Sequence, residues 1–205
     1  MFSYAAVERG VPAIAYSDAT SEQRSYQYIN ETTPSGYPDR ATIYAQASVD
    51  LVQQLISGAS DQSRLLPYGY GLSVNYPFVT SLTNDSCVKP TFVQTRMTGG
   101  AQVDRAVFNE TSGLFTFGNT DGPGLNTCIN GDCGLPGETV VVNDGNCRSS
   151  VSVFTVDYDA PTTGQTDTVR GGLLPLVEFQ GNGTGGGNHT KRAERLRSGR
   201  YFRSV

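Results

Sequence analysis

The stretch YAAVERGVPAIAYS (Tyr4–Ser17) decides the fold class. A helical turn runs up to Gly10, and a short apolar run with Pro12 near its start then extends to Ser17. A helix, a glycine and a short apolar run in this order are typical of a buried strand in an α/β sheet. Because a buried parallel strand needs neighbours on both sides, we expect other strands to flank it.

A long amphipathic helix, at about Pro38–Ser57, is the clearest element that follows. Pro38 suits a first helical turn, Asp39 complements the helix dipole there, and Gly58 follows the end. Residues at three- and four-residue steps predict a stripe that packs on the sheet: Ala41, Tyr44, Ala45, Ser48, Val49, Val52, Leu55 and Ile56. The alternating segment LSVNYP (72–77) predicts a partner strand that Pro77 ends.

Short strands and turns dominate the rest of the chain, and we expect a β-hairpin extension over about 88–160. Its expected strands are FVQTRM (92–97), QVDRAVF (102–108), GLFTF (113–117), ETVVV (138–142) and SVSVFTVDY (150–158). NETSG (109–113) joins the middle pair and NDGNC (143–147) joins the last pair. The segment GQTDT (164–168) is expected to be a turn, and LLPLVEF (173–179) a short strand or helix. The folded domain is thus expected over 1–177, and 178–205 as a disordered Gly-rich and then basic tail.

Composition and charge exclude several classes of protein. The 205 residues suffice for one domain with its own core, and no run approaches the ~20 apolar residues of a membrane span. The tail from Lys191 onward holds six of the 15 basic residues and one of the 19 acidic residues, so the body before it has 9 basic and 18 acidic residues, a net charge of −9. An acidic body argues against binding to a nucleic-acid polymer.

Sequons and cysteines indicate the secretory pathway. Five N-x-[ST] sequons stand in polar, turn-prone segments, at Asn30, Asn84, Asn109, Asn182 and Asn188. We expect glycosylation at the first three. The four cysteines have the spacing of neither a CxxC pair nor a zinc ribbon, which favours disulfides over a metal site. No signal peptide is recognisable at the N-terminus.

The four cysteines allow three pairings. Cys128 and Cys133 bracket a turn at Asn130-Gly131 that brings two arms of chain together. If these two pair, Cys87 and Cys147 are left to each other. We expect this pairing.

Motifs that would carry chemistry are scarce. The single histidine, His189, lies in the Gly-rich tail, which excludes a Ser-His-Asp triad in the folded body. Asn143-Asp144-Gly145 follows an apolar run, as metal-binding carboxylates do in some α/β phosphatases. However, a hard divalent ion generally needs more than one carboxylate, and these residue types favour a β-turn. A turn is therefore the better interpretation.

The segments GVPAIAYS (10–17) and LSVNYP (72–77), with a long helix between them, resemble the SurE-like (survival protein E) phosphatases and nucleotidases. Members of that family typically read Gly-[IV]-Pro-[AS]-Ile-Ala-x-Ser, then a long helix, then Leu-x-[VI]-Asn-[IV]-Pro. Tyr76 stands where an aliphatic residue is usual. The cysteine-bearing continuation to VSVFTVDYDAP (151–161) is similar to the fungal, secreted acid-phosphatase branch. The resemblance covers about residues 4–161.

The resemblance implies a Rossmann-like α/β domain, often oligomeric, that hydrolyses phosphate monoesters, including nucleotides, with a divalent metal such as Mg²⁺ or Mn²⁺. The family's metal ligands lie in an Asn-Asp-Asp-Gly motif and in Ser and Asn residues before the equivalent of Tyr4, and this chain has none of them. We therefore assign no catalytic or metal-binding residue, and expect no metal for this chain alone. Ser17 and Asp18, at the end of the first strand, are the candidates for the substrate rim, whereas Asn75 is expected to be structural.

Two functions remain open. The first is the C-terminal part of a secreted, metal-dependent phosphatase that is inactive as this chain alone. By the resemblance, the full-length form is expected to be able to form a homo-oligomer. The second is a non-catalytic secreted glycoprotein that keeps only binding or oligomer contacts.

Overall fold

A central mixed sheet organises the protein. The computed structural model describes residues 2–19, 22–59, 64–98, 103–120, 128 and 131–179. The sheet order is β1-β2-β6-β3-β8, with β7 beside β6. The strands are β1 (Ala13–Asp18), β2 (Gly71–Tyr76), β3 (Thr91–Thr95), β6 (Arg148–Thr155), β7 (Tyr158–Asp159) and β8 (Val177–Glu178). The pairs β1–β2, β3–β6 and β3–β8 are parallel, whereas β6 runs antiparallel to β2 and β7.

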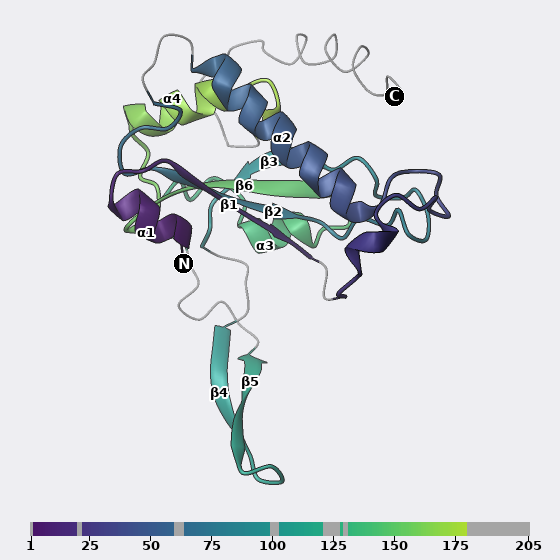
Figure 1. Cartoon of the computed structure of the whole chain (residues 1–205). Helices are drawn as coiled ribbons and strands as arrows, with labels where there is room; N and C mark the ends of the chain where they lie inside the picture. Colours follow the sequence, from purple (N-terminus) through teal and green to yellow (C-terminus); the bar gives the residue numbers. More distant parts are fainter. Residues whose placement is uncertain are drawn as a thin grey trace.

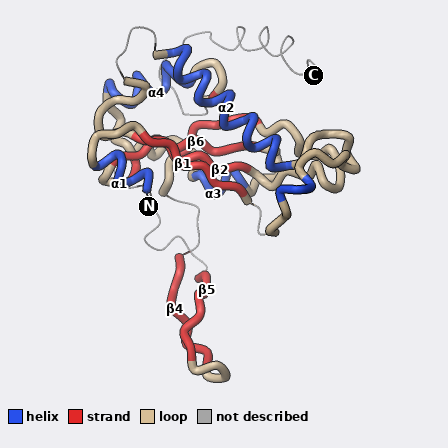
Figure 2. The backbone as a smooth tube through the Cα atoms, viewed as in Figure 1, coloured by secondary structure: helices blue, strands red, loops and turns tan. Residues whose placement is uncertain are grey.

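Helices cover both faces of this sheet. The long helix α2 (Arg40–Gly58) and α4 (Gly164–Leu173) lie on one side, and α1 (Phe2–Glu8) and α3 (Glu138–Val142) on the other (Figures 1 and 2). A short 3₁₀ turn, η1 (Tyr26–Tyr28), interrupts the loop before α2. The expected α/β, Rossmann-like fold class is confirmed. None of the described helices combines the length and the apolar character needed to cross a membrane.

Helix α2 differs from the expectation in its start and in its buried face. It begins after Asp39, whose Oδ1 accepts a hydrogen bond from the Ala41 amide at 3.0 Å, so Asp39 is the N-cap and Pro38 lies outside the helix. The side chains on its buried line are Tyr44, Ala47, Leu51 and Leu55. The expected stripe omitted Ala47 and Leu51 and included Val49 and Ile56, which are 46% and 56% exposed. The helix carries two neighbouring apolar lines, and periodicity alone does not show which one the sheet covers.

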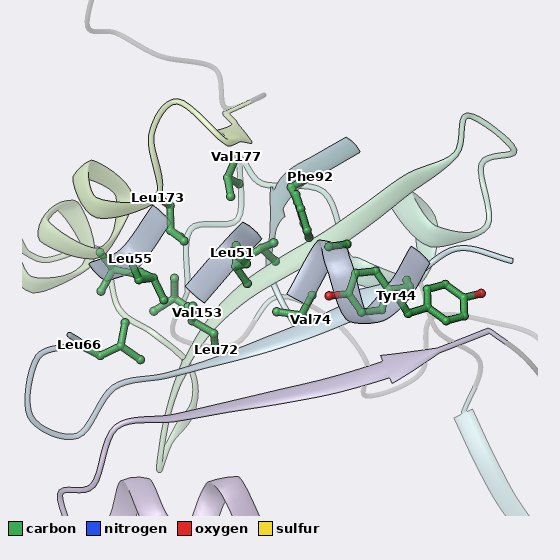
Figure 3. Close-up of a cluster of buried hydrophobic side chains, with 14 of the residues drawn as sticks. Tyr44, Leu51, Leu55, Leu66, Leu72, Val74, Phe92, Val153, Leu173 and Val177 are labelled. Carbon is green, nitrogen blue, oxygen red and sulfur yellow. The ribbon is translucent and has the colours of Figure 1, made fainter. Parts of the chain in front are cut away.

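The core lies between α2, α4 and the sheet (Figure 3). Leu51 and Leu55 of α2 are buried together with Leu72 and Val74 of β2, and Leu173 of α4 joins the same cluster. Each such side chain contributes roughly 1.5–3 kcal/mol through the burial of apolar surface. This packing fixes the sheet against which the candidate site is built.

The hairpin region is much smaller than expected. Only β4 (Val103–Asn109) and β5 (Leu114–Thr120) form a separate two-stranded sheet among the described residues, and it projects away from the body (Figure 1). Gly113 closes its turn with a φ of 68°, as a positive-φ position requires. The expectation of hairpins over 88–160 is wrong for β3 and β6, because both are strands of the central sheet.

The segment ETVVV is a helix and not the predicted strand. It forms α3, whose Val141 is 1% exposed and whose first amide, Glu138 N, donates to the Arg96 carbonyl at 2.9 Å. Valine runs favour strands locally, but here packing against the sheet overrides that preference. NDGNC therefore joins a helix to β6 and does not join two strands.

The segment GQTDT is also helical and forms the first half of α4. Helix α4 approaches the end of α2 so closely that a Cβ on Gly58 would stand 2.8 Å from the Gly172 backbone. Downstream, Val177 and Glu178 pair with β3 as β8, so the ordered body extends past the expected boundary at residue 177. The rest of the predicted tail, from residue 180, lies outside the described residues.

Two disulfides are present, and they join the expected cysteines. Cys87–Cys147 spans 60 residues and links the loop after β2 to the residue before β6. Cys128–Cys133 closes a short loop of five residues. Disulfides of this kind are typical of extracellular and secretory-pathway proteins.

Candidate functional site

A polar cavity lies at the carboxyl ends of the parallel strands β1 and β2. Its volume is about 170 Å³, and its lining residues come from β1 and the residue after it, from β2, and from α3 with its C-cap: Asp18, Ala19, Asn75, Tyr76, Glu138, Thr139, Val142 and Asn143. We call it the β1–β2 cavity. Ligands of open α/β sheets bind in crevices outside the carboxyl ends of their strands, so this is the place where a site is expected.

Glu138 is the most perturbed carboxyl group that lines the β1–β2 cavity. Burial raises its pKa to about 7, and the negative charge of Asp159 also raises it, while hydrogen bonds from Ser152 and Asn75 act in the opposite direction. Ser152 Oγ lies 3.2 Å from Glu138 Oε2. The carboxyl group of Glu138 therefore keeps its proton up to near-neutral pH.

A layer of buried hydroxyl groups on the central strands supports the cavity wall. Ser150 and Ser152 of β6 are fully buried. Asn75 Nδ2 donates to Ser150 Oγ at 3.4 Å, and Ser152 Oγ also lies 2.7 Å from Thr95 Oγ1 of β3. These hydrogen bonds fix the side chains of Asn75 and Glu138 against β6, which restricts their rotamers in the absence of a ligand.

The two rim candidates from the sequence lie in different places. Asp18 pairs with Tyr76 at the end of β1 and lines the cavity. Ser17 pairs with Asn75 in the strand and is exposed, but it is not among the lining residues. Asn75, which the sequence indicated as structural, both bonds to Ser150 and lines the cavity.

The Asn143-Asp144-Gly145 segment is a turn after α3. Burial of Asp144 raises its pKa, but hydrogen bonds from Arg148 and Asn146 outweigh this effect and leave that pKa below its ordinary value. Arg148 bonds to Asp144 through both Nε and a terminal nitrogen. Asp144 is thus engaged in an ion pair within the turn, and only Asn143 of this segment reaches the cavity.

Reasoning from sequence missed Glu138 and Thr139 as site residues. Their segment was interpreted as a strand of a distant hairpin, and a strand there would not meet β1 and β2. One signal was available, since Pro136-Gly137 followed by Glu138 resembles a helix start with an acidic first turn, and Gly137 is in fact the N-cap of α3.

The three sequons expected to be glycosylated lie on the surface. Asn30, Asn84 and Asn109 are all exposed, and Asn109 is the last residue of β4, at the hairpin turn. Its Oδ1 accepts the Thr111 amide at 2.9 Å. An oligosaccharide at these positions would meet no packed neighbour. Asn182 and Asn188 lie outside the described residues.

Comparison with known proteins relates the chain to one relative, whereas no family model matches the chain. The chain is 42% identical over 186 residues to a protein of Yarrowia lipolytica (strain CLIB 122 / E 150) named acid phosphatase. The likeness is to part of a phosphatase. The match takes in 89% of this chain but 50% of the relative, so the chain spans about half the length of the curated protein that it matches.

Proposed function

We propose that this chain is part of a secreted hydrolase of phosphate monoesters, of the SurE-like acid-phosphatase kind. The observation that carries the proposal is the 42% identity to the acid phosphatase of Yarrowia lipolytica over most of this chain. The resemblance of GVPAIAYS and LSVNYP to SurE-like proteins is in line with the same conclusion.

The location of the β1–β2 cavity supports a role next to the reaction centre. It is formed where β1 and β2 end, and Asp18, Asn75 and Glu138 are all among its lining residues. In a doubly wound sheet, ligands bind outside the carboxyl ends of neighbouring strands. A reacting group held at the end of a strand next to β1 would therefore lie beside the β1–β2 cavity. We infer that the cavity contacts the bound ester.

The described residues do not fit a divalent metal centre on their own. Among them, no group of three or more His, Cys, Asp or Glu side chains is arranged to hold an ion. The two carboxyl groups of the cavity include Glu138, which burial keeps protonated until about pH 7 and which is therefore a poor ligand. We propose that Mg²⁺ or Mn²⁺, if the hydrolysis requires it, is bound by residues outside this chain.

The edge of the central sheet supports a larger assembly. β1 pairs with β2 on one side and, within the described chain, with no strand on its other side. It is a full six-residue strand, whereas β8 at the opposite edge has only two residues. A long apolar edge strand is normally covered, since it presents unpaired backbone groups. We infer that a strand from the remainder of the phosphatase pairs with β1.

Secretion and glycosylation complete the proposal. The two disulfides and the exposed sequons at Asn30, Asn84 and Asn109 suit the secretory pathway. Expression in a secreting eukaryotic host, followed by mass spectrometry of peptides before and after glycosidase treatment, tests the three asparagines directly.

A chimera tests the proposed reaction. The matched segment of the Yarrowia lipolytica acid phosphatase is replaced by this chain, and release of phosphate from a chromogenic ester is measured with Mg²⁺ or Mn²⁺ and with a chelator. We expect turnover that depends on the metal, with the unaltered relative as the positive control. A chimera that is secreted and folded but inactive would reject the phosphatase proposal and favour a non-catalytic glycoprotein.

A further inference from the structure

The β1–β2 cavity has a lining that suits uncharged hydroxyl groups. The groups that reach it include two carboxyl groups, from Asp18 and Glu138, two amides, from Asn75 and Asn143, and the hydroxyl of Thr139. Amides and hydroxyls both donate and accept hydrogen bonds, and so does a protonated carboxyl group such as that of Glu138. A ligand with neighbouring hydroxyl groups both donates and accepts hydrogen bonds, so it needs donors and acceptors together in the lining.

The same lining disfavours an anion. No lysine, arginine or histidine is among the residues that line the cavity. Glu138 itself is held protonated by burial, which shows that negative charge is costly at this wall. A phosphate group placed inside would face Asp18 and lack a positive partner, so the phosphoryl end of an ester belongs outside the cavity.

The polar wall is pre-organised. Asn75 is held by Ser150 and Glu138 by Ser152, both from β6 in the middle of the sheet. Anchored side chains lose little further freedom when a ligand binds, so their hydrogen bonds contribute more to affinity.

The size of the cavity limits the ligand. A volume of about 170 Å³ is close to the ~150 Å³ of a cavity known to hold one benzene ring, so a small polyol or a single sugar ring fits the described part of the cavity.

We propose that the β1–β2 cavity is a subsite for an uncharged polyhydroxyl group, a polyol or a sugar. The assignment to the alcohol part of a phosphate ester rests on the proposed phosphatase function. Binding of a free polyol to the cavity does not rest on the phosphatase function, and it is therefore tested separately.

The experiment uses the full 205-residue chain, labelled with ¹⁵N and titrated with ribose, glycerol, phenol, inorganic phosphate and Mg²⁺ in turn. We expect ribose and glycerol to shift the amide signals around Asn75, Thr139 and Asn143, with dissociation constants in the millimolar range for such small ligands. Thr139→Val removes one hydroxyl at constant shape and should weaken ribose binding about tenfold, which corresponds to one lost hydrogen bond.

Gln53→Ala is the matched control, because it removes an exposed polar side chain on α2, whose residues do not line the cavity. Asn143→Ala is a second test if Thr139→Val fails to fold. Ribose that leaves these amides unshifted, phenol that binds as well as ribose, or phosphate or Mg²⁺ that shifts the same signals more strongly would each overturn the subsite. The chimera assay of phosphatase activity is independent of all these outcomes.

Discussion

Glu138 shows how one side chain couples the candidate site to pH. Its ordinary pKa of 4.5 rises to about 7 in the folded protein, chiefly through burial. Between these two values the unfolded chain releases the proton and the folded chain keeps it. The free energy of unfolding must therefore fall as the pH rises through this window, and the full penalty is present above about pH 7.

Glu138→Gln should remove that pH dependence, because the amide is neutral at every pH. We expect no stabilisation relative to the wild type near pH 4, and a gain that approaches about 3 kcal/mol at pH 8, from ~1.4 kcal/mol per pKa unit. Urea unfolding at pH 4, 6 and 8 measures it. Glu110→Gln, on the exposed hairpin turn, is the matched control for the loss of a charge. A difference between Glu138→Gln and wild type that does not change with pH would refute the interpretation.

Elements with a strong periodic pattern are the ones that the sequence predicts well. α2 is recognisable from its helical period, β1 from its short apolar run after Gly10 and β2 from its alternation, and both disulfides were expected from spacing and turn residues. α3 and α4 are not recognisable in this way. The first is a five-residue segment with three consecutive valines and the second contains Gly171 and Gly172, so their helical state depends on packing against the sheet and against α2. The β1–β2 cavity was predicted only on its Asp18 side for the same reason, because α3 supplies the opposite wall.

The contact between α2 and α4 gives a test at this scale. A Cβ on Gly58 would lie 2.8 Å from the Gly172 backbone, whereas a Cβ on Gly172 meets only Leu55, at 3.9 Å. Gly58→Ala should therefore separate the helices and destabilise the fold by roughly 1–3 kcal/mol. Gly172→Ala should be neutral or gain up to ~1 kcal/mol from helix propensity. Thermal unfolding compares the two, and equal effects would mean that the helices do not pack as described.

The two disulfides should differ in their contribution to stability. On chain-entropy grounds the 60-residue separation of Cys87–Cys147 corresponds to about 4 kcal/mol, and the five-residue separation of Cys128–Cys133 to about 2 kcal/mol. The double replacement of Cys87 and Cys147 by serine should thus lower the denaturation midpoint more than the same change at Cys128 and Cys133. The reverse order would contradict the entropic account.

At the scale of the whole molecule, the sheet formed by the described residues is open along β1. Tyr16 of β1 and Val49 of α2 leave apolar surface exposed on the same side as this edge, and the Tyr16 hydroxyl bonds to the Ser48 carbonyl of α2. The sequence already indicated this, because the apolar run at 11–17 needs neighbours on both sides. What the sequence could not supply was the position of α3, which completes the cavity. The edge of β1 that is open within the described residues and the match to half of an acid phosphatase agree with one account.

The proposal with the most direct test is that this chain contributes part of the lining of a phosphatase site but not its metal ligands. The most direct measurement is hydrolysis of a chromogenic phosphate ester by the purified 205-residue chain, with Mg²⁺ or Mn²⁺ and then with a chelator, across acidic and neutral pH. We predict no release of product above the uncatalysed rate under any of these conditions. Turnover by the chain alone that the chelator abolishes would contradict the account.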